Sequence, residues 1–143
     1  MKLRQISIFL ENRAGRMAEV TEILGRVGVN IRALSLADTA DFGIIRLIPD
    51  KVDVALDVLK AEGITVKETE VIAVEIPDRP GALAEILKIL GDAEINVEYL
   101  YGFLDRAGEN AIMVFRFEET DRALKILSDK GYQALPGERV HTI

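Results

Sequence analysis

The sequence predicts an α+β protein made of two βαββαβ domains that pack together. Three observations carry this prediction. The chain of 143 residues matches itself when Ile6 is placed over Ile72. Within each copy, apolar residues follow helical spacing in two segments and form strand-like runs in four others. No segment rich in proline, glycine or serine separates the copies, so one domain is expected at residues 1–71 and the other at 72–143.

The internal repeat rests on identical residues at equivalent positions. The first half of copy one shares with copy two the residues Arg13, Gly15, Ala18, Glu19, Ile23, Leu24, Gly25 and Asn30, matched by Arg79, Gly81, Ala84, Glu85, Ile89, Leu90, Gly91 and Asn96. The second half shares Ala55, Leu56, Leu59 and Gly63, matched by Ala123, Leu124, Leu127 and Gly131. The second match requires two additional residues in copy two, which we place in the turns at 38–43 and 105–110.

The first half of copy one is predicted to be a strand, a helix and a turn. Residues 5–10 form a short run of β-branched and apolar residues, which is typical of a strand. Residues 15–27 place apolar side chains at helical spacing, which predicts a helix with one buried face: Met17, Val20, Leu24 and Val27. Gly28 and Asn30 then stand where the helix should end and the chain should turn.

The second half of copy one is predicted to be a hairpin, a helix and a strand. Residues 30–37 and 42–48 read as two strands on either side of a polar turn. A helix is expected from Pro49 to Gly63, with its buried face formed by Val52, Ala55, Leu56 and Leu59. Residues 64–72 supply the final strand.

Copy two repeats this order. Its expected elements are a strand at 72–76, a helix at 80–93, hairpin strands at 95–104 and 110–117, a helix at 119–130 and a last strand beginning near Tyr132. The first of these helices should bury Leu83, Ile86, Leu87 and Leu90. Residues 68–74 are compatible with a strand throughout, so the last strand of copy one is expected to run directly into the first strand of copy two.

Short connections require both helices of a copy to cross the same face of its sheet. The right-handed crossover rule then gives each copy a ferredoxin-like βαββαβ arrangement. The opposite face of the sheet carries no helix and must be covered. We therefore expect pairing between the domains or between chains, and a homodimer.

Composition narrows the function classes. The chain carries 24 Asp and Glu residues against 18 Lys and Arg, and its net charge of −6 argues against binding to nucleic acid or to an anionic membrane. Cysteine is absent and His141 is the single histidine, so no metal and no cofactor is expected. No apolar run reaches the ~20 residues that span a bilayer, and no secretory pattern opens the chain, so we expect a cytoplasmic protein.

The loop between the first strand and the first helix is the candidate binding segment of each copy. It contains Asn12, Arg13, Ala14 and Gly15 in copy one, and Asp78, Arg79, Pro80 and Gly81 in copy two. A glycine at the helix start lets a ligand reach backbone N–H groups that have no partner within the helix, which suits a carboxylate. Asn12 or Asp78 can accept a hydrogen bond from an ammonium group, so the two ends of a free α-amino acid are matched. The structural alternative is that Asn12 and Asp78 cap the helices, Pro80 starts one and Gly81 relieves crowding.

The loop and its surroundings resemble the ACT domain, an amino-acid-sensing regulatory module. The resemblance lies in residues 78–87, DRPGALAEIL, and 95–97, INV, of copy two. In copy one, residues 11–16, ENRAGR, and 29–31, VNI, are similar to the ACT domain of acetolactate synthase regulatory subunits. The resemblance covers essentially the whole chain as a tandem pair.

The resemblance implies a ligand site where this loop of one domain faces the second strand of a neighbour. By position it implies binding roles for the eight loop residues, Asn12 to Gly15 and Asp78 to Gly81, and for the turn asparagines Asn30 and Asn96. Copy one departs from the pattern, with Asn12 in place of the acid and Ala14 in place of the proline. An uncharged Asn12 attracts an ammonium group less strongly, so the two sites need not be equivalent.

These observations favour a non-catalytic sensor. It would bind a free amino acid at the interface of the two ACT domains and regulate an enzyme of amino-acid metabolism or an assembly. One alternative is an assembly module that binds no ligand. The other is an acylphosphatase-like hydrolase using the arginines and asparagines of the repeat, Arg13, Arg79, Asn30 and Asn96, although no activated nucleophile or base is evident.

Overall fold

The computed structural model describes residues 2–38, 41–104 and 108–142. The chain divides into two compact units, Arg4–Thr69 and Glu70–Ile143, and Met1–Leu3 belongs to the second. Within the described ranges, no helix is long and apolar enough to cross a membrane. The two additional residues that the sequence places in the turn of copy two fall partly on 105–107, outside the described residues.

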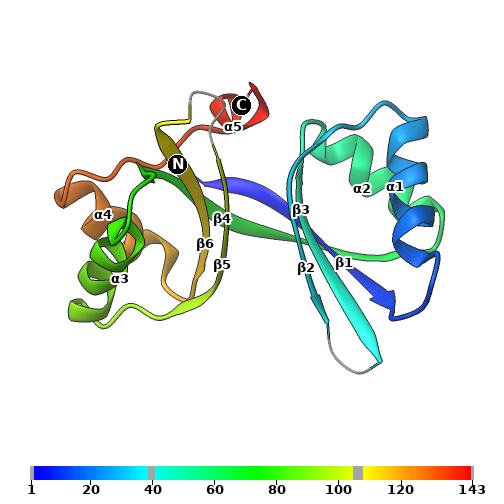
Figure 1. Ribbon diagram of the computed structural model, residues 1–143. Helices are drawn as coiled ribbons and strands as arrows, with labels where there is room; N and C mark the ends of the chain where they lie inside the picture. Colours follow the sequence, from blue (N-terminus) through cyan, green and yellow to red (C-terminus); the bar gives the residue numbers. More distant parts are fainter. Residues whose placement is uncertain (1, 39–40, 105–107, 143) are drawn as a thin grey trace. The chain divides into compact units, whose positions relative to one another are not determined.

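The unit Arg4–Thr69 has the predicted βαββαβ order (Figure 1). Its elements are β1 (Leu3–Glu11), α1 (Arg16–Arg26), β2 (Ile31–Asp38), β3 (Phe42–Pro49), α2 (Val52–Ala61) and the first part of β4 (Thr65–Pro77). Hydrogen-bonded neighbours follow the order β2-β3-β1-β4. The ferredoxin-like fold class expected from the crossover rule is therefore confirmed for copy one.

The core of this unit lies between its strands and its two helices. In the antiparallel pair of β1 and β3, Ile6 lies opposite Leu47 and Ile8 opposite Ile45, so all four side chains point to one face. The helices add the buried side chains Val20, Ile23, Leu24, Ala55, Leu56 and Leu59. Figure 1 shows α1 and α2 on the same side of the strands. Burial of this apolar face is the main driving force for folding of the unit.

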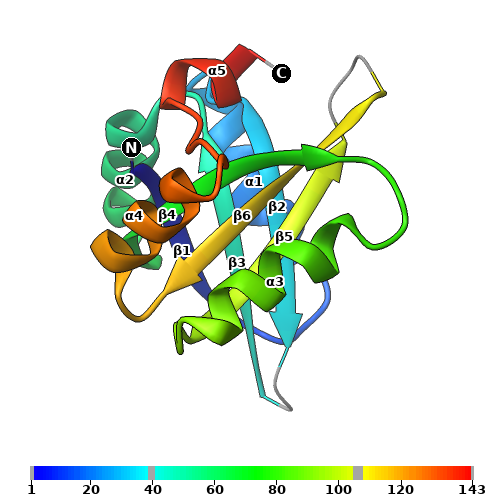
Figure 2. The same ribbon diagram turned by 90° about the vertical axis from the view of Figure 1, so that its left-hand side faces the viewer.

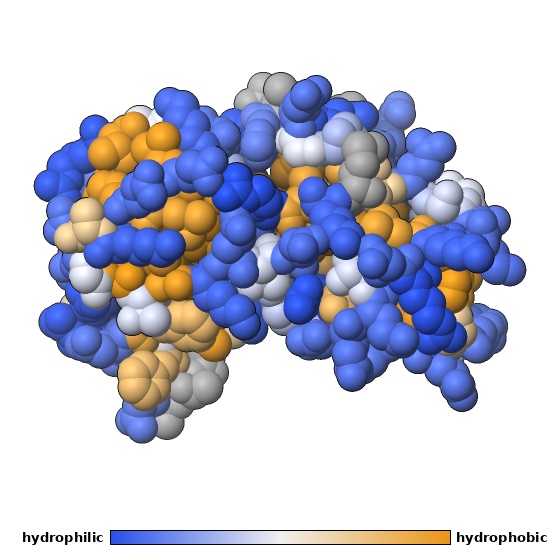
Figure 3. All heavy atoms as spheres, turned by 180° about the vertical axis from the view of Figure 1, so that it is seen from behind, coloured by the Kyte–Doolittle hydropathy of each residue, from blue (hydrophilic) through white to orange (hydrophobic). Residues whose placement is uncertain are grey.

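Two residues of the predicted buried face of α1 are exposed instead. Met17 and Val27 are 38% and 39% exposed. Met17 lies in the first turn of α1, and Val27 is the C-terminal cap with φ of −98°, so neither lies over the middle of the sheet. Further exposed apolar side chains of this unit, Phe9, Leu34, Leu36 and Phe42, lie on its strands. Figure 3 shows hydrophobic surface, in orange, between hydrophilic residues, in blue.

The unit Glu70–Ile143 repeats the architecture with one strand fewer. Its elements are the rest of β4, α3 (Ala82–Asp92), β5 (Val97–Leu104), β6 (Asn110–Phe117), α4 (Thr120–Asp129) and α5 (Gly137–Thr142). The strand order is β4-β6-β5, and α3 and α4 cover one face of these strands (Figure 2). The core contains Ile72, Val74, Ile76, Ile86, Leu90, Phe115, Phe117, Ala123 and Leu127.

Strand β4 connects the two copies without a break. It runs from Thr65 to Pro77 as a single strand of 13 residues. This confirms the prediction that the last strand of copy one continues into the first strand of copy two.

The predicted last strand of copy two is wrong. Near Tyr132 the chain makes only one isolated antiparallel bridge, between Val74 and Ala134, and then enters α5. Pro136 ends the pairing because it has no N–H for a strand ladder. Its carbonyl instead accepts hydrogen bonds from the N–H groups of Arg139 (3.1 Å) and Val140 (3.3 Å), which form the first turn of α5.

Candidate ligand-binding loops

The loops before α1 and α3 have the same backbone structure. Gly15 and Gly81 are the N-terminal caps of these helices, with φ, ψ of 89°, −13° and 87°, −12°. This left-handed conformation costs little for glycine and is strained for other residues. A Cβ atom at either position would meet nothing within 4 Å. The conformation of the loop therefore requires these glycines, and the suggestion that Gly81 relieves crowding is wrong.

Four pairs of equivalent backbone hydrogen bonds hold the two loops in shape. At the start of the loop, the N–H groups of Asn12 and Asp78 donate across the sheet to the carbonyls of Asp41 and Glu109, both at 3.0 Å. In the second pair, the N–H groups of Arg13 and Arg79 donate to the carbonyls of Glu11 and Pro77. In the third pair, the N–H groups of Arg16 and Ala82 donate to the carbonyls of Arg13 and Arg79. In the fourth pair, the N–H groups of Glu19 and Glu85 donate to the carbonyls of Gly15 and Gly81. The loop geometry is thus duplicated along with the sequence, including the hydrogen bond that begins each helix.

No side chain caps the N-terminus of α1 or α3 in the part of the chain that the structure describes. The suggestion that Asn12 and Asp78 serve as helix caps is therefore wrong. Pro80 does not start α3 either, because the helix begins at Ala82, one residue after its glycine cap. The Arg16 and Ala82 N–H groups donate to carbonyls of the loops, and among the described residues no side chain caps the remaining first-turn N–H groups, which sit at the positive end of the helix dipole. Such an arrangement can bind a carboxylate or another anion.

The arginines of the loops are paired with nearby glutamates. Arg13 Nε donates to Glu11 Oε2 at 2.8 Å, and Arg79 Nη2 lies 3.1 Å from Glu85 Oε2. All four side chains are between half and two-thirds exposed, so these ion pairs are weak. An incoming carboxylate can therefore compete with the glutamates for either guanidinium.

Arg16 is a candidate that sequence reasoning missed. Its Nη1 is 2.7 Å from Glu19 Oε2, and its side chain is only 17% exposed. Its Nε is buried and has no hydrogen-bond partner among the described residues. The equivalent residue of copy two is Ala82, which is 2% exposed. The signal in the sequence is this difference between the copies: a cation follows the loop glycine in copy one, and a small apolar residue follows it in copy two.

The turn asparagines lie at the opposite end of each sheet from the loops. Asn30 exchanges two hydrogen bonds with Asp50, both at 2.9 Å, just beyond the Pro49 end of β3. Asn12 is bonded at the other end of β3, whose eight residues span roughly 25 Å at about 3.4 Å per residue. Within the unit, Asn12 and Asn30 therefore do not come together.

Copy two has the same separation. The carbonyl of Asn96 accepts a hydrogen bond from the Glu118 N–H at 3.4 Å, beyond the Phe117 end of β6, whereas Asp78 is bonded at its Asn110 end. The hydrolase alternative needs an arginine and an asparagine at one point, and neither unit brings its own pair together. Among the described residues, no three His, Asp or Glu side chains form a group that could hold a metal ion.

Comparison with known proteins identifies the family. A family model for the ACT domain pair matches residues 1–142. The chain belongs to the ACT domain pair family. The resemblance inferred from the sequence is therefore confirmed, and so is the fold class for the pair. No curated protein matches the sequence.

Solved structures share the fold of this ACT domain pair. Protein BT0572 from Bacteroides thetaiotaomicron is 36% identical, with a TM-score of 0.94 over 100% of this chain and 98% of its own. The ligand-free regulatory subunit of aspartate kinase from Thermus thermophilus is 15% identical, with a TM-score of 0.65 over 90% of this chain and 92% of its own. The corresponding subunit from Thermus flavus is 17% identical, with a TM-score of 0.64 over 88% and 90%. At the identities of the two Thermus proteins, the likeness is one of fold alone.

Proposed function

We propose that this ACT domain pair is a non-catalytic regulatory protein that senses a free amino acid through its strand–helix loops. The observation that carries the proposal is the duplicated loop, in which a left-handed glycine precedes a helix whose first-turn N–H groups have no side-chain cap. These N–H groups would bind the carboxylate of the amino acid. Asn12 or Asp78, which do not cap the helices, would accept from its ammonium group.

The two loops differ in charge, and we propose that they are not equivalent. In copy two, Asp78 offers a carboxylate to the ammonium group, and a charge-assisted hydrogen bond is stronger than a neutral one. In copy one, Asn12 is uncharged, but the residue after Gly15 is Arg16, whose guanidinium is partly buried. The copy two loop should therefore hold the ammonium end more strongly, and the copy one loop the carboxylate end.

Regulation would follow from a change in the population of two conformations. A ligand stabilises the arrangement that it binds more tightly, and a coupling of about 1–3 kcal/mol is ordinary for such a site. A sensor of a free amino acid suits an enzyme that makes or consumes that amino acid, so the proposed partner is an enzyme of amino-acid metabolism. We place the protein in the cytoplasm as a homodimer. Support for the dimer comes from the edge strand β2, where Leu34 and Leu36 are each 50% exposed.

A thermal-shift screen against the twenty common amino acids tests the proposal. One or a few of them should stabilise the protein, because a ligand at 100-fold excess over its Kd adds about 2.7 kcal/mol to the free energy of unfolding. N-acetylated and amidated forms of any hit are the controls, since each removes one of the two charged ends. A flat response to all twenty at millimolar concentration would contradict the sensor function and favour the assembly module.

A further inference from the structure

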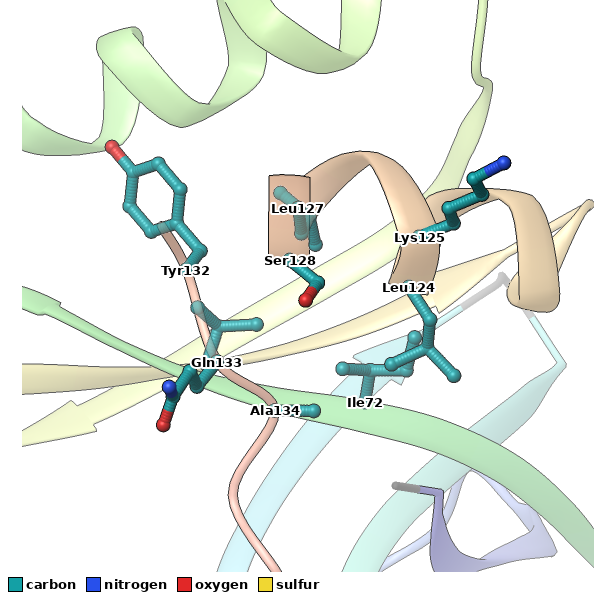
Figure 4. Close-up of a pocket in the computed structure, with 9 residues that line it drawn as sticks. Ile72, Leu124, Lys125, Leu127, Ser128, Tyr132, Gln133 and Ala134 are labelled. Atoms are coloured by element: carbon teal, nitrogen blue, oxygen red, sulfur yellow. The ribbon is translucent and has the colours of Figure 1, made fainter. Parts of the chain in front are cut away.

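A hollow lies between α4 and β4 in the unit Glu70–Ile143. Its volume is about 410 Å³, which is within the range of small-molecule sites. The lining residues come from β4, from α4 and from the segment that follows it: Ile72, Val74, Leu124, Lys125, Leu127, Ser128, Tyr132, Gln133 and Ala134. Figure 4 shows Leu124, Leu127 and Ser128 on the helical side of the hollow, with Ile72 and Ala134 across from them.

The hollow borders the segment that leaves α4, where copy two has no regular fourth strand. The chain exits the second helix with the same backbone hydrogen bond in both copies. The Ile64 N–H donates to the Leu59 carbonyl at 3.0 Å, and the Tyr132 N–H donates to the Leu127 carbonyl at 2.8 Å. Two residues later, copy one has Val66, which packs against its core as part of β4.

Copy two has the smaller Ala134 at that place, which makes an isolated bridge to Val74, and the Leu135 N–H donates to the Ala73 carbonyl at 2.7 Å. The chain therefore still runs beside β4 in copy two, but with a smaller side chain than Val66 and without a regular strand. The hollow lies next to this segment.

The chemistry of the lining favours a small molecule with an apolar body and a negative charge. The floor is apolar and buried, with Ile72 and Val74 fully covered and Leu127 2% exposed. The rim is polar and exposed, and it contains Lys125, Ser128 and Gln133. Among the described residues, the lining contains one cation and no acidic side chain.

We propose that this hollow binds a small carboxylate with an aliphatic body. The aliphatic part would rest on the half-buried Leu124 and Tyr132 and on the edge of Leu127, and the carboxylate would lie at the rim near the Lys125 ammonium and the Ser128 hydroxyl. The site is distinct from the loop at Asp78, which begins where β4 ends, and it goes beyond the amino-acid sensing proposed for that loop.

Methyl NMR of the full chain with hexanoate as the probe tests the site. Millimolar hexanoate should shift the methyl signals of Ile72, Leu124 and Leu127 in a saturable manner. The neutral probe 1-hexanol should shift the same signals more weakly, and hexylamine should bind least. No shift of these methyl groups with hexanoate would overturn the proposal.

Variants at Ala134 and Lys125 test separately how the apolar floor and the charged rim contribute to hexanoate binding. Ala134→Leu fills the hollow and should abolish the hexanoate shifts; shifts that persist in this folded variant would also overturn the proposal. Ala134→Val, which restores the residue type of copy one, serves the same purpose if the leucine disturbs folding. Lys125→Gln should weaken hexanoate binding by about two- to fivefold and leave hexanol binding unchanged, as expected for an exposed ion pair.

Matched controls distinguish hexanoate binding in the hollow from ligand binding at the loops. Lys88→Gln removes another exposed helical lysine of the same unit and should leave hexanoate binding unchanged. Asp78→Asn should weaken amino-acid binding without altering the hexanoate shifts. A loss of hexanoate binding in Asp78→Asn would instead assign the probe to the loop and overturn the separate site.

Discussion

Gly15 and Gly81 share a left-handed backbone conformation, with φ of 89° and 87°, at the N-terminal caps of α1 and α3. Neither has a neighbour within 4 Å of where a Cβ atom would be. Their role is therefore conformational. The two residues are the clearest sign that the duplication preserved a local structure as well as a fold.

We expect Gly15→Ala and Gly81→Ala to destabilise the protein by about 1–2 kcal/mol each, the cost of a left-handed conformation for an L-residue. Urea unfolding followed by circular dichroism measures this cost. The matched controls are Gly25→Ala and Gly91→Ala, which lie inside α1 and α3 with open space around them. Because alanine favours a helix over glycine, these controls should be stabilised by up to about 1 kcal/mol. Equal effects at caps and controls would refute a conformational role for the loop glycines.

Removing the charge at Asp78 and adding one at Asn12 should change ligand affinity in opposite directions. Asp78→Asn removes the acceptor charge of copy two and should weaken the amino acid found in the screen by about tenfold, the worth of a charge-assisted hydrogen bond. Asn12→Asp should strengthen binding at copy one. Calorimetric titration of both variants measures the effect. Unchanged affinity in both variants would show that neither side chain touches the ligand. Neither variant should lose much stability, because neither side chain caps a helix.

Removal of the Arg16 guanidinium should weaken binding of the ligand's carboxylate end and leave binding of its ammonium end unchanged. Arg16→Met keeps most of the aliphatic length and removes the charge, so carboxylate binding at copy one should weaken by about tenfold, as for a charged hydrogen bond. The amidated form of the ligand lacks the carboxylate and should lose no affinity. The test is titration of both forms against wild type and variant. A parallel loss for the two forms would indicate a general disturbance of the loop instead of a carboxylate contact.

The stability contributed by Asp53 should depend on pH. Arg4 donates a hydrogen bond to Asp53 Oδ1 at 2.7 Å, and this bond, with the positive charge of Arg4, lowers the pKa of Asp53 below its ordinary value of 3.8. A lowered pKa in the folded state means that the stabilisation is present above 3.8 and is lost as the pH falls below it. Asp53→Asn should therefore reduce the urea midpoint at neutral pH, with the difference from wild type shrinking in acid.

The effect at Asp53 should also decrease with added salt, because both side chains are exposed. Asp57→Asn, on the same helix and without an ion pair among the described residues, is the control and should show no such pH dependence. A difference between wild type and Asp53→Asn that is constant with pH would mean that the ion pair contributes nothing.

A side chain at Gly102 should require Met113 to change its side-chain conformation. The two residues lie opposite each other on β5 and β6, and a Cβ atom at Gly102 would be 2.6 Å from Met113 Sδ. Because this sulfur belongs to a flexible side chain that can turn aside, Gly102→Ala should destabilise the protein by about 1 kcal/mol, the low end of overpacking. In a Met113→Ala background this penalty should disappear, which a double-mutant cycle of urea unfolding detects. The same penalty in both backgrounds would place its origin in the backbone of β5.

The element order of copy one, the duplication and the two loop glycines were predictable from the sequence alone. Helical spacing around Leu24 and Leu90, the uninterrupted strand at 68–74 and the matched Gly15 and Gly81 are local features. A local pattern is sufficient to predict them because burial of one face and a positive φ each depend on a few consecutive residues.

Where these elements meet depends on the folded structure. The fold separates Asn12 from Asn30 along the length of β3, and it gives copy two one isolated bridge before Pro136 in place of a fourth strand. Periodicity says which face of an element is buried, but it does not say which strand edge will be paired or how far. That outcome depends on contacts between residues distant in sequence, which no short pattern records.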